Sequence, residues 1–138
     1  MDRTENEIAD IIVPTAIEVH RTLGGPGLLE CVYERALAWE LKQAGLGVQE
    51  QFQVPVIYKG QVLGEPLRLD LLVDEKVIVE CKATTQFHPV FQSQVLTYLR
   101  LSNLKLGFVI NFGEKLVTNG IHRVANGLED GSRRKPGD

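Results

Sequence analysis

Two carboxylates and a lysine lie close together in the most apolar part of this chain. Asp70 interrupts the segment LRLDLLV, and Glu80 and Lys82 occupy the end of the segment VIVECK. A carboxylate in a buried strand costs several kcal/mol unless a cation or hydrogen bonds compensate it. Hard carboxylate oxygens beside a lysine are the composition of a Mg²⁺ site that activates water. The three residues therefore predict either metal-assisted hydrolysis or a buried network of ion pairs.

The sequence around these residues predicts a β-hairpin, because two short apolar segments flank a polar triplet. The strands are expected at Leu67–Val73 and Val77–Cys81. A three-residue loop between them places Asp70 opposite Glu80, whereas a two-residue loop would turn Asp70 to the other face. Side chains alternate along a strand, so Glu80 and Lys82 share a face and Cys81 points the other way. Two facing carboxylates would repel each other unless a cation binds both.

Three motifs, in this order, resemble those of the PD-(D/E)xK nuclease superfamily. Residues 27–33 (Gly-Leu-Leu-Glu-Cys-Val-Tyr) match the Gly-x-x-Glu-x-x-Tyr motif of the GxxExxY family, which is assigned to that superfamily. Asp70 followed by residues 80–82 (Glu-Cys-Lys) looks like the Asp…Glu-x-Lys motif. Residues 94–98 (Gln-Val-Leu-Thr-Tyr) are similar to the Gln-x-x-x-Tyr element of RecB-like members. The resemblance extends over residues 8–124, nearly the whole chain.

This resemblance implies an α/β fold with a restriction-endonuclease-like core, in which helices flank a mixed β-sheet. It implies a nuclease that hydrolyses phosphodiester bonds of nucleic acid, with DNA as the expected substrate. Asp70, Glu80 and the backbone carbonyl of Cys81 would hold Mg²⁺ or Mn²⁺. Lys82 would orient or deprotonate the attacking water and stabilise charge on the phosphate. Gln94 would position the site or contact DNA.

Three further residues are candidates for the site. Glu30 has two interpretations: an acid in the first turn of a helix, favoured by the helix dipole, or the further metal ligand that the superfamily resemblance implies. Tyr33 is expected to pack in the core, with its hydroxyl available to support the site. Tyr98 lies four residues after Gln94, so both are expected on one side of a helix.

Apolar residues at helical spacing predict three helices. They are expected at residues 5–23, 28–44 and 90–101. Pro14 would either kink the first helix or mark a new start, because proline removes one backbone hydrogen bond. The run Gly24-Gly25-Pro26-Gly27 ends the first helix, since four such residues do not continue one.

The other apolar segments predict strands beside the hairpin. They are residues 48–58, 104–111, 116–117 and 121–124. In the first segment three glutamines fall on one parity, and the other parity carries Val48, Glu50, Phe52, Val54, Val56 and Tyr58. This alternation is typical of one strand with a solvent-exposed face. The segment 104–111 is expected to pair in parallel with the strand of Glu80, because a helix connects the two.

The composition is that of a globular protein, with 43% hydrophobic and 24% charged residues in a chain of 138. One domain is expected at residues 1–125, followed by a disordered tail at 126–138. The chain has no apolar stretch of about 18 residues, so we expect no membrane span. Its first residues lack the pattern of a signal peptide, which favours a cytoplasmic location with reduced, packed thiols at Cys31 and Cys81.

The net charge of −3 argues against the simplest nuclease hypothesis. Proteins that bind nucleic acid usually carry a basic stripe, because phosphate contacts dominate their affinity. The alternative is a catalytically weak or inactive nuclease fold that binds nucleic acid or a protein partner. Divalent-metal binding would separate the two hypotheses. A homodimer is compatible with the resemblance, since one site cuts one strand.

Overall fold

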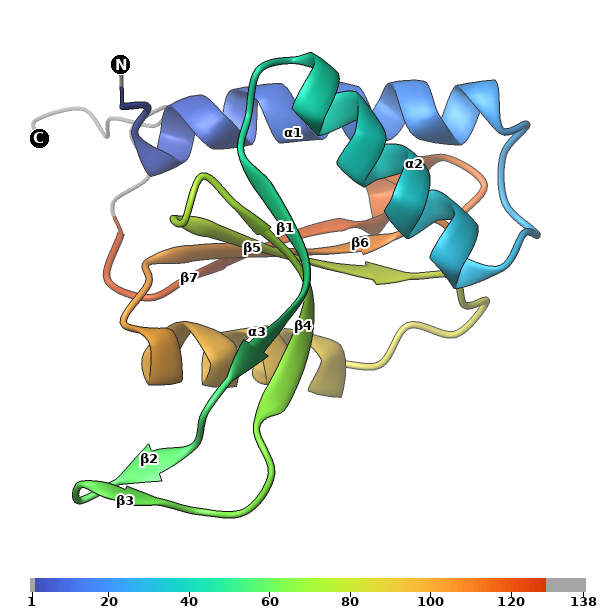
Figure 1. Ribbon diagram of the computed structural model, residues 1–138. Helices are drawn as coiled ribbons and strands as arrows, with labels where there is room; N and C mark the ends of the chain where they lie inside the picture. Colours follow the sequence, from blue (N-terminus) through green and yellow to red (C-terminus); the bar gives the residue numbers. More distant parts are fainter. Residues whose placement is uncertain (1, 129–138) are drawn as a thin grey trace, which may run out of the picture.

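The structure is a computed structural model that describes residues 2–128. A five-stranded mixed sheet has the order β1-β4-β5-β6-β7, and only β5 and β6 are parallel neighbours. Its strands are β1 (Val48–Val54), β4 (Leu67–Val73), β5 (Val77–Lys82), β6 (Leu106–Asn111) and β7 (Ile121–Ala125). Figure 1 shows α1 (Glu5–Thr22) and α2 (Glu30–Gln43) on one face and α3 (Val90–Ser102) on the other. The expected α/β architecture with helices flanking a mixed sheet is confirmed.

The first helix begins at a capping box and continues through its proline. The Thr4 hydroxyl accepts from the Glu7 N–H at 3.2 Å, and the Glu7 carboxylate accepts from the Thr4 N–H at 2.8 Å. Pro14 lies inside α1, and the neighbouring Thr15 hydroxyl donates to the Ile11 carbonyl at 2.6 Å. The alternative that Pro14 marks a new helix is therefore wrong. No helix among residues 2–128 is long and apolar enough to cross a membrane.

Tyr33 joins the core to the glycine-rich loop between α1 and α2. Its side chain is fully buried and stacks on Phe112 with ring centroids 4.8 Å apart. The hydroxyl donates to the Gly25 carbonyl at 2.7 Å and accepts from the Leu28 N–H at 3.1 Å. The hydroxyl therefore holds the loop that leads into α2, and its described hydrogen bonds do not reach Asp70 or Glu80.

Replacing Tyr33 with phenylalanine is expected to destabilise the fold without changing metal binding. The substitution leaves the Gly25 carbonyl and the Leu28 N–H without their partner, which costs about 1–2 kcal/mol of unfolding free energy. Urea unfolding measures this loss. Tyr58→Phe is the matched control, because Tyr58 is 60% exposed. Equal stability of the two variants would contradict the assigned role.

The hairpin has the expected register. Val73 pairs with Val77, Leu72 with Ile78 and Leu71 with Val79, as a three-residue loop requires. The parallel pairing of β5 with β6 is also confirmed. At Gly107 of β6, an added Cβ would lie 2.5 Å from the Val95 side chain of α3. Glycine there lets α3 approach the sheet closely.

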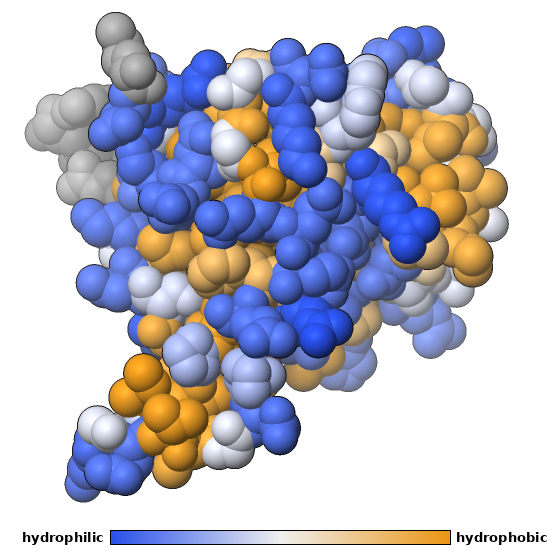
Figure 2. All heavy atoms as spheres, viewed as in Figure 1, coloured by the Kyte–Doolittle hydropathy of each residue, from blue (hydrophilic) through white to orange (hydrophobic). Residues whose placement is uncertain are grey.

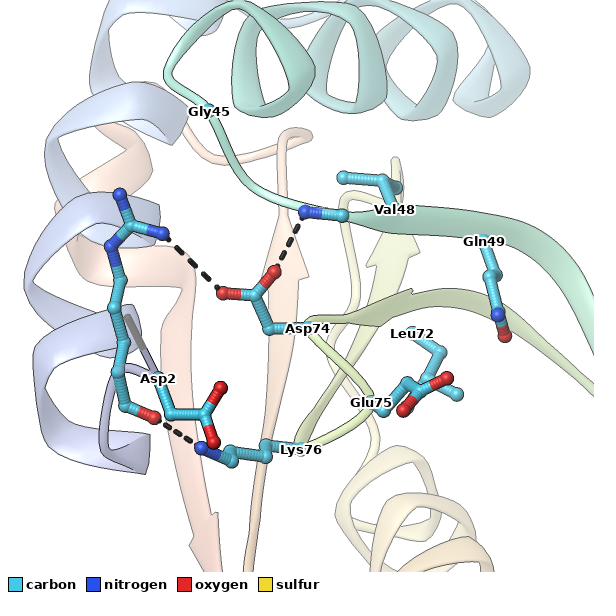
Figure 3. A pocket seen from close by; sticks show the side chains of 10 residues that line it. Asp2, Gly45, Val48, Gln49, Leu72, Asp74, Glu75 and Lys76 are labelled. Carbon is cyan, nitrogen blue, oxygen red and sulfur yellow. Dashed lines mark hydrogen bonds and ion pairs between the residues drawn. The ribbon is translucent and has the colours of Figure 1, made fainter.

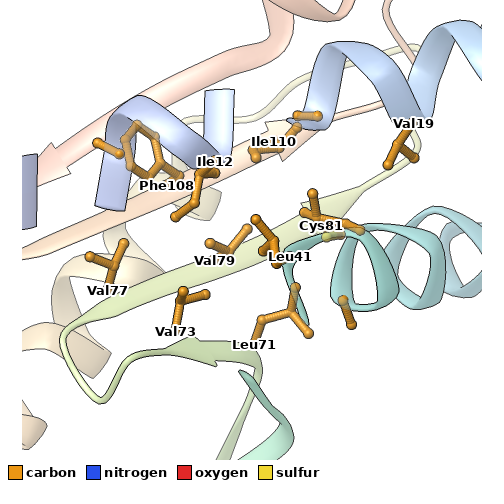
Figure 4. Close-up of a cluster of buried hydrophobic side chains, with 14 of the residues drawn as sticks. Ile12, Val19, Leu41, Leu71, Val73, Val77, Val79, Cys81, Phe108 and Ile110 are labelled. Atoms are coloured by element: carbon orange, nitrogen blue, oxygen red, sulfur yellow. The ribbon is translucent and has the colours of Figure 1, made fainter. Parts of the chain in front are cut away.

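Buried side chains form one cluster on each face of the sheet. The cluster beneath α1 and α2 is drawn in Figure 4 and includes Ile12, Leu41, Val79, Cys81 and Ile110. The cluster beneath α3 includes Leu69, Leu72, Ile78, Val95, Tyr98, Leu99 and Val109. Cys81 is on the α1–α2 face, as its alternation with Glu80 and Lys82 predicted. Cys31 is exposed, so the prediction that both thiols are packed holds only for Cys81.

Strands β1 and β4 change faces halfway along their length. In β1, Val48 packs against the α1–α2 cluster, whereas Phe52 packs against the α3 cluster. In β4, Leu71 packs in the α1–α2 cluster, whereas Leu69 packs in the α3 cluster. The predicted single alternation through residues 48–58 is therefore wrong, because Gln51 has a φ of +53° and interrupts it.

The expected strand 48–58 is also divided at its end. It stops at Val54, before Pro55, and the chain then forms a separate hairpin of β2 (Ile57–Tyr58) and β3 (Gln61–Val62). This hairpin projects from the sheet (Figure 1), and apolar side chains are exposed on it (Figure 2). They belong to Ile57, Tyr58, Val62 and Leu63.

The end of the domain differs in one element. Residues 116–117 are not a strand, because the 3₁₀ helix η1 (Val117–Gly120) follows Leu116. Of the two short strands expected here, only β7 is present, and it pairs with β6. Asn126 is held by the Lys105 and Leu104 carbonyls, at 2.8 Å and 2.9 Å. Most of the predicted disordered tail, residues 129–138, lies outside the described residues.

Candidate active site

Asp70 and Glu80 face each other just beyond the paired residues of β4 and β5. There, hydrogen bonds from side chains to backbone replace the backbone pairing of the two strands. The Asp70 N–H donates to the Glu80 Oε1 at 2.7 Å, and the Cys81 N–H donates to the Asp70 Oδ2 at 2.8 Å. Each carboxylate thus bonds the backbone of the opposite strand. The two acids meet as the predicted register requires.

The α2 helix contributes an acid that the sequence analysis missed. Glu34 is 8% exposed, and its Oε2 accepts from the Gln51 Nε2 at 2.6 Å. The same nitrogen lies 3.5 Å from the Asp70 Oδ1. A signal for Glu34 was present, because Ala38 and Leu41 follow it at helical spacing and are buried. Nothing in a strand pattern singles out Gln51.

The cluster of Glu34, Asp70 and Glu80 holds more negative charge than its surroundings stabilise. Burial and the charge of Asp70 raise the pKa of Glu80 to about 8, against the lowering effects of the Asp70 N–H and Lys82. Burial raises the pKa of Glu34 to about 7, with Asp70 raising it further and Gln51 lowering it. Near neutral pH, Glu80 and Glu34 therefore keep part of their protons in the metal-free protein.

Lys82 lies on the same face of β5 as Glu80, as predicted. Its Nζ is 4.6 Å from the centre of the Phe91 ring on α3, a cation–π contact. Its charge lowers the pKa of both Glu80 and Glu30. Tyr98 of α3 is almost buried near these acids: burial raises its pKa, and the charges of Glu80 and Asp70 add to that effect.

Glu30 and Gln94 are further from the centre of the cluster. Glu30 is the first residue of α2 and is exposed. Partial desolvation of its carboxyl group by neighbouring atoms raises its pKa and Asp70 adds to this, whereas Lys82 and the Ala83 backbone lower it. Glu30 is thus at the margin of the cluster, within reach of its charges. Gln94 is exposed on α3, and its side chain makes no hydrogen bond within residues 2–128.

The donor set fits a hard divalent cation, although the acids are bonded to the backbone in this structure. Carboxylate oxygens are the ligands that Mg²⁺ and Mn²⁺ prefer, and Glu34, Asp70 and Glu80 supply them. Within the described part of the chain, no group of three His, Cys, Asp or Glu side chains already has metal-site geometry. Burial, and after it the charge of Asp70, raises the pKa values of Glu80 and Glu34, and a bound cation would offset both effects.

A hollow in the surface lies away from these acids. It has a volume of about 670 Å³ and borders the β4–β5 loop (Figure 3), at the other end of β5 from Lys82. Asp74 there accepts from the Gly47 N–H at 2.7 Å and lies 3.6 Å from Arg3. The bonds of Asp74 to Gly47 and Arg3 therefore hold the β4–β5 loop against the start of β1 and the N-terminal segment.

Comparison with known proteins gives a family for this arrangement. A family model described as the PD-(D/E)XK nuclease superfamily matches residues 6–124. The matched range contains Glu34, Gln51, Asp70, Glu80 and Lys82. No curated protein and no solved structure matches the chain.

Proposed function

This chain belongs to the PD-(D/E)XK nuclease superfamily, and from that membership we propose that it is a Mg²⁺- or Mn²⁺-dependent nuclease acting on DNA. The observation that carries this proposal is the cluster of Glu34, Asp70 and Glu80 beside Lys82. Three acids with too little positive charge around them suit a cation that must also bind phosphate. Membership in the GxxExxY family stays a prediction from residues 27–33.

Asp70, Glu80 and the Cys81 carbonyl would hold the ion, with Glu34 as a further ligand from α2. A bound divalent ion would lower the pKa of a water molecule and stabilise the charge on the phosphate. Glu30, at the margin, would act through its charge or as an outer ligand. The backbone bonds of Asp70 and Glu80 fix which oxygen of each acid is engaged and which is left for binding.

Lys82 supplies a positive charge on the face of β5 that also carries Glu80. The Phe91 ring beneath its ammonium restricts the side chain without neutralising it. A lysine held in this way would orient the attacking water and stabilise the negative charge that develops on the phosphate. Gln94, one turn before Tyr98 and exposed, is free to contact the nucleic acid.

A nuclease fold that only binds a partner is the second candidate, and the net charge of −3 favours it. Such a module would bind nucleic acid or protein without a divalent ion and without cleavage. A homodimer and a cytoplasmic location are proposals under either function.

The test is titration calorimetry with Mn²⁺ on the wild type and Asp70→Asn. The asparagine keeps an oxygen that accepts from the Cys81 N–H but loses the negative charge, so it should fold. We expect Mn²⁺ binding to weaken by about 100-fold or more. Asp10→Asn, exposed on α1, is the matched control and should bind normally. An intact wild type that does not bind Mn²⁺ would favour the binding module.

A further inference from the structure

We infer that Gln51 is a positioning residue of the proposed active site, whose side-chain amide holds Glu34 of α2 against Asp70 of β4. The inference rests on the proposed function, because it assigns a role within the same site. Gln51 comes from a third element, β1, and is the described residue that contacts both acids. It would set the separation of two ligands that come from a helix and a strand.

The contacts support a positioning role. A primary amide has two N–H donors on one nitrogen, so Gln51 can donate to both acids at once. The bond to Glu34 is short, 2.6 Å, and the approach to Asp70 is longer, 3.5 Å. The amide carries no net charge, so it orients the carboxylates without neutralising them. A lysine at this position would compete with the cation for the same acids.

The backbone at Gln51 has an unfavourable conformation that this role accounts for. Its φ of +53° is in the left-handed region, which costs a non-glycine residue roughly 1 kcal/mol. The neighbouring pairs Glu50–Leu71 and Phe52–Leu69 remain in register, so the distortion is confined to Gln51 and the Asp70 opposite it. The distortion lies at the point where β1 and β4 change faces.

The change of faces alone does not require a glutamine. Glycine adopts a positive φ without this cost and would allow the same bend. The side-chain amide of Gln51 contacts Glu34 and Asp70. By contrast, the exposed Gln49 and Gln53 of the same strand make no side-chain hydrogen bond within residues 2–128. A left-handed backbone with a side chain directed at two acids indicates a constraint from the site.

Gln51→Gly separates the amide from the backbone conformation, since it removes the first and favours the second. We expect Mn²⁺ affinity, measured by calorimetry, to fall about 10- to 100-fold, as for other residues that orient metal ligands. We expect the melting temperature of the metal-free protein to stay equal or rise. If Gln51 had only a structural role, the substitution would lower the melting temperature and leave the Mn²⁺ affinity unchanged. Gln49→Gly is the matched control and should lower the melting temperature without changing affinity.

A second measurement on the metal-free protein keeps this inference separate from the proposed function. In NMR spectra, the side-chain amide protons of Gln51 should exchange with water more slowly than those of Gln49 and Gln53. Glu34→Ala should abolish that difference. Fast exchange in the wild type, or unchanged Mn²⁺ affinity in Gln51→Gly, would overturn the inference. Slow exchange that depends on Glu34, in a wild type that binds no Mn²⁺, would support the contact of Gln51 with Glu34. The same result would contradict the proposal that the protein is a metal-dependent nuclease.

Discussion

Replacing Lys82 with alanine is expected to lower the rate of DNA cleavage by about 10²–10⁴-fold, the range for a group that transfers protons or stabilises charge in the transition state. Its ammonium lies over Phe91 on the face of β5 that carries Glu80. Alanine removes this charge from the position where water and phosphate would meet. Single-turnover cleavage of a labelled duplex with Mg²⁺ or Mn²⁺ measures the loss.

A measurement of metal binding shows whether the lower cleavage rate of Lys82→Ala comes from the chemical step or from loss of the metal ion. Lys82→Ala should bind Mn²⁺ at least as tightly as the wild type, because removing a positive charge beside Glu80 favours a cation. Lys115→Ala, which removes an exposed lysine after β6, is the control and should cleave normally. Cleavage by Lys82→Ala at the wild-type rate would show that the assigned role is wrong.

The sequence was sufficient to predict the placement of the central residues of the candidate site, because hairpin geometry is local. The loop of three residues sets the register of β4 and β5, and alternation then places Asp70, Glu80 and Lys82. Both rules depend on residues within about ten positions of each other. The fold class followed from the order of the elements and from the family motifs.

The positions of Gln51 and Glu34 in the candidate site depend on the backbone φ of Gln51 and on which side of α2 faces the sheet. Strand periodicity places Gln51 on a wet face, and it cannot show that a φ of +53° interrupts the alternation. The family motif directs attention to Glu30, yet the turn of α2 that faces Asp70 carries Glu34. Packing of α2 against the sheet decides between these acids, and this is a long-range property.

The candidate pair on α3 shows the same limit. Four residues separate Gln94 from Tyr98, so both lie on one side of the helix. Tyr98 is nearly buried close to Glu80, but Gln94 is one turn nearer the start of α3 and is exposed. Helical spacing gives the side of a helix that a residue occupies. The depth of that residue depends on where the sheet ends, which spacing does not predict.

Without metal, the protein is expected to lose stability as the pH rises from 5 to 9. The pKa of Glu80 is raised from 4.5 to about 8 in the folded protein, so the native state binds its proton more tightly than the unfolded chain. The stability from this proton is complete below about pH 4.5 and is lost as the pH passes 8. We expect a loss on the order of 2–4 kcal/mol in the unfolding free energy, measured with urea in the presence of a chelator.

Glu80→Gln should remove the part of this pH dependence that belongs to Glu80, because its amide is neutral at every pH and its oxygen can still accept from the Asp70 N–H. A smaller slope should remain from Glu34, whose pKa is raised to about 7. Glu65→Gln, in an exposed segment, is the control and should keep the wild-type slope. Mn²⁺ should restore stability to the wild type above pH 7, where it competes with the proton for Glu80, but much less to Glu80→Gln. A wild type that gains stability from pH 5 to 9 without metal, or a Glu80→Gln variant with an unchanged slope, would contradict the proton-binding role. Because each arm compares folded with unfolded protein, this result tests the charge of the site independently of cleavage.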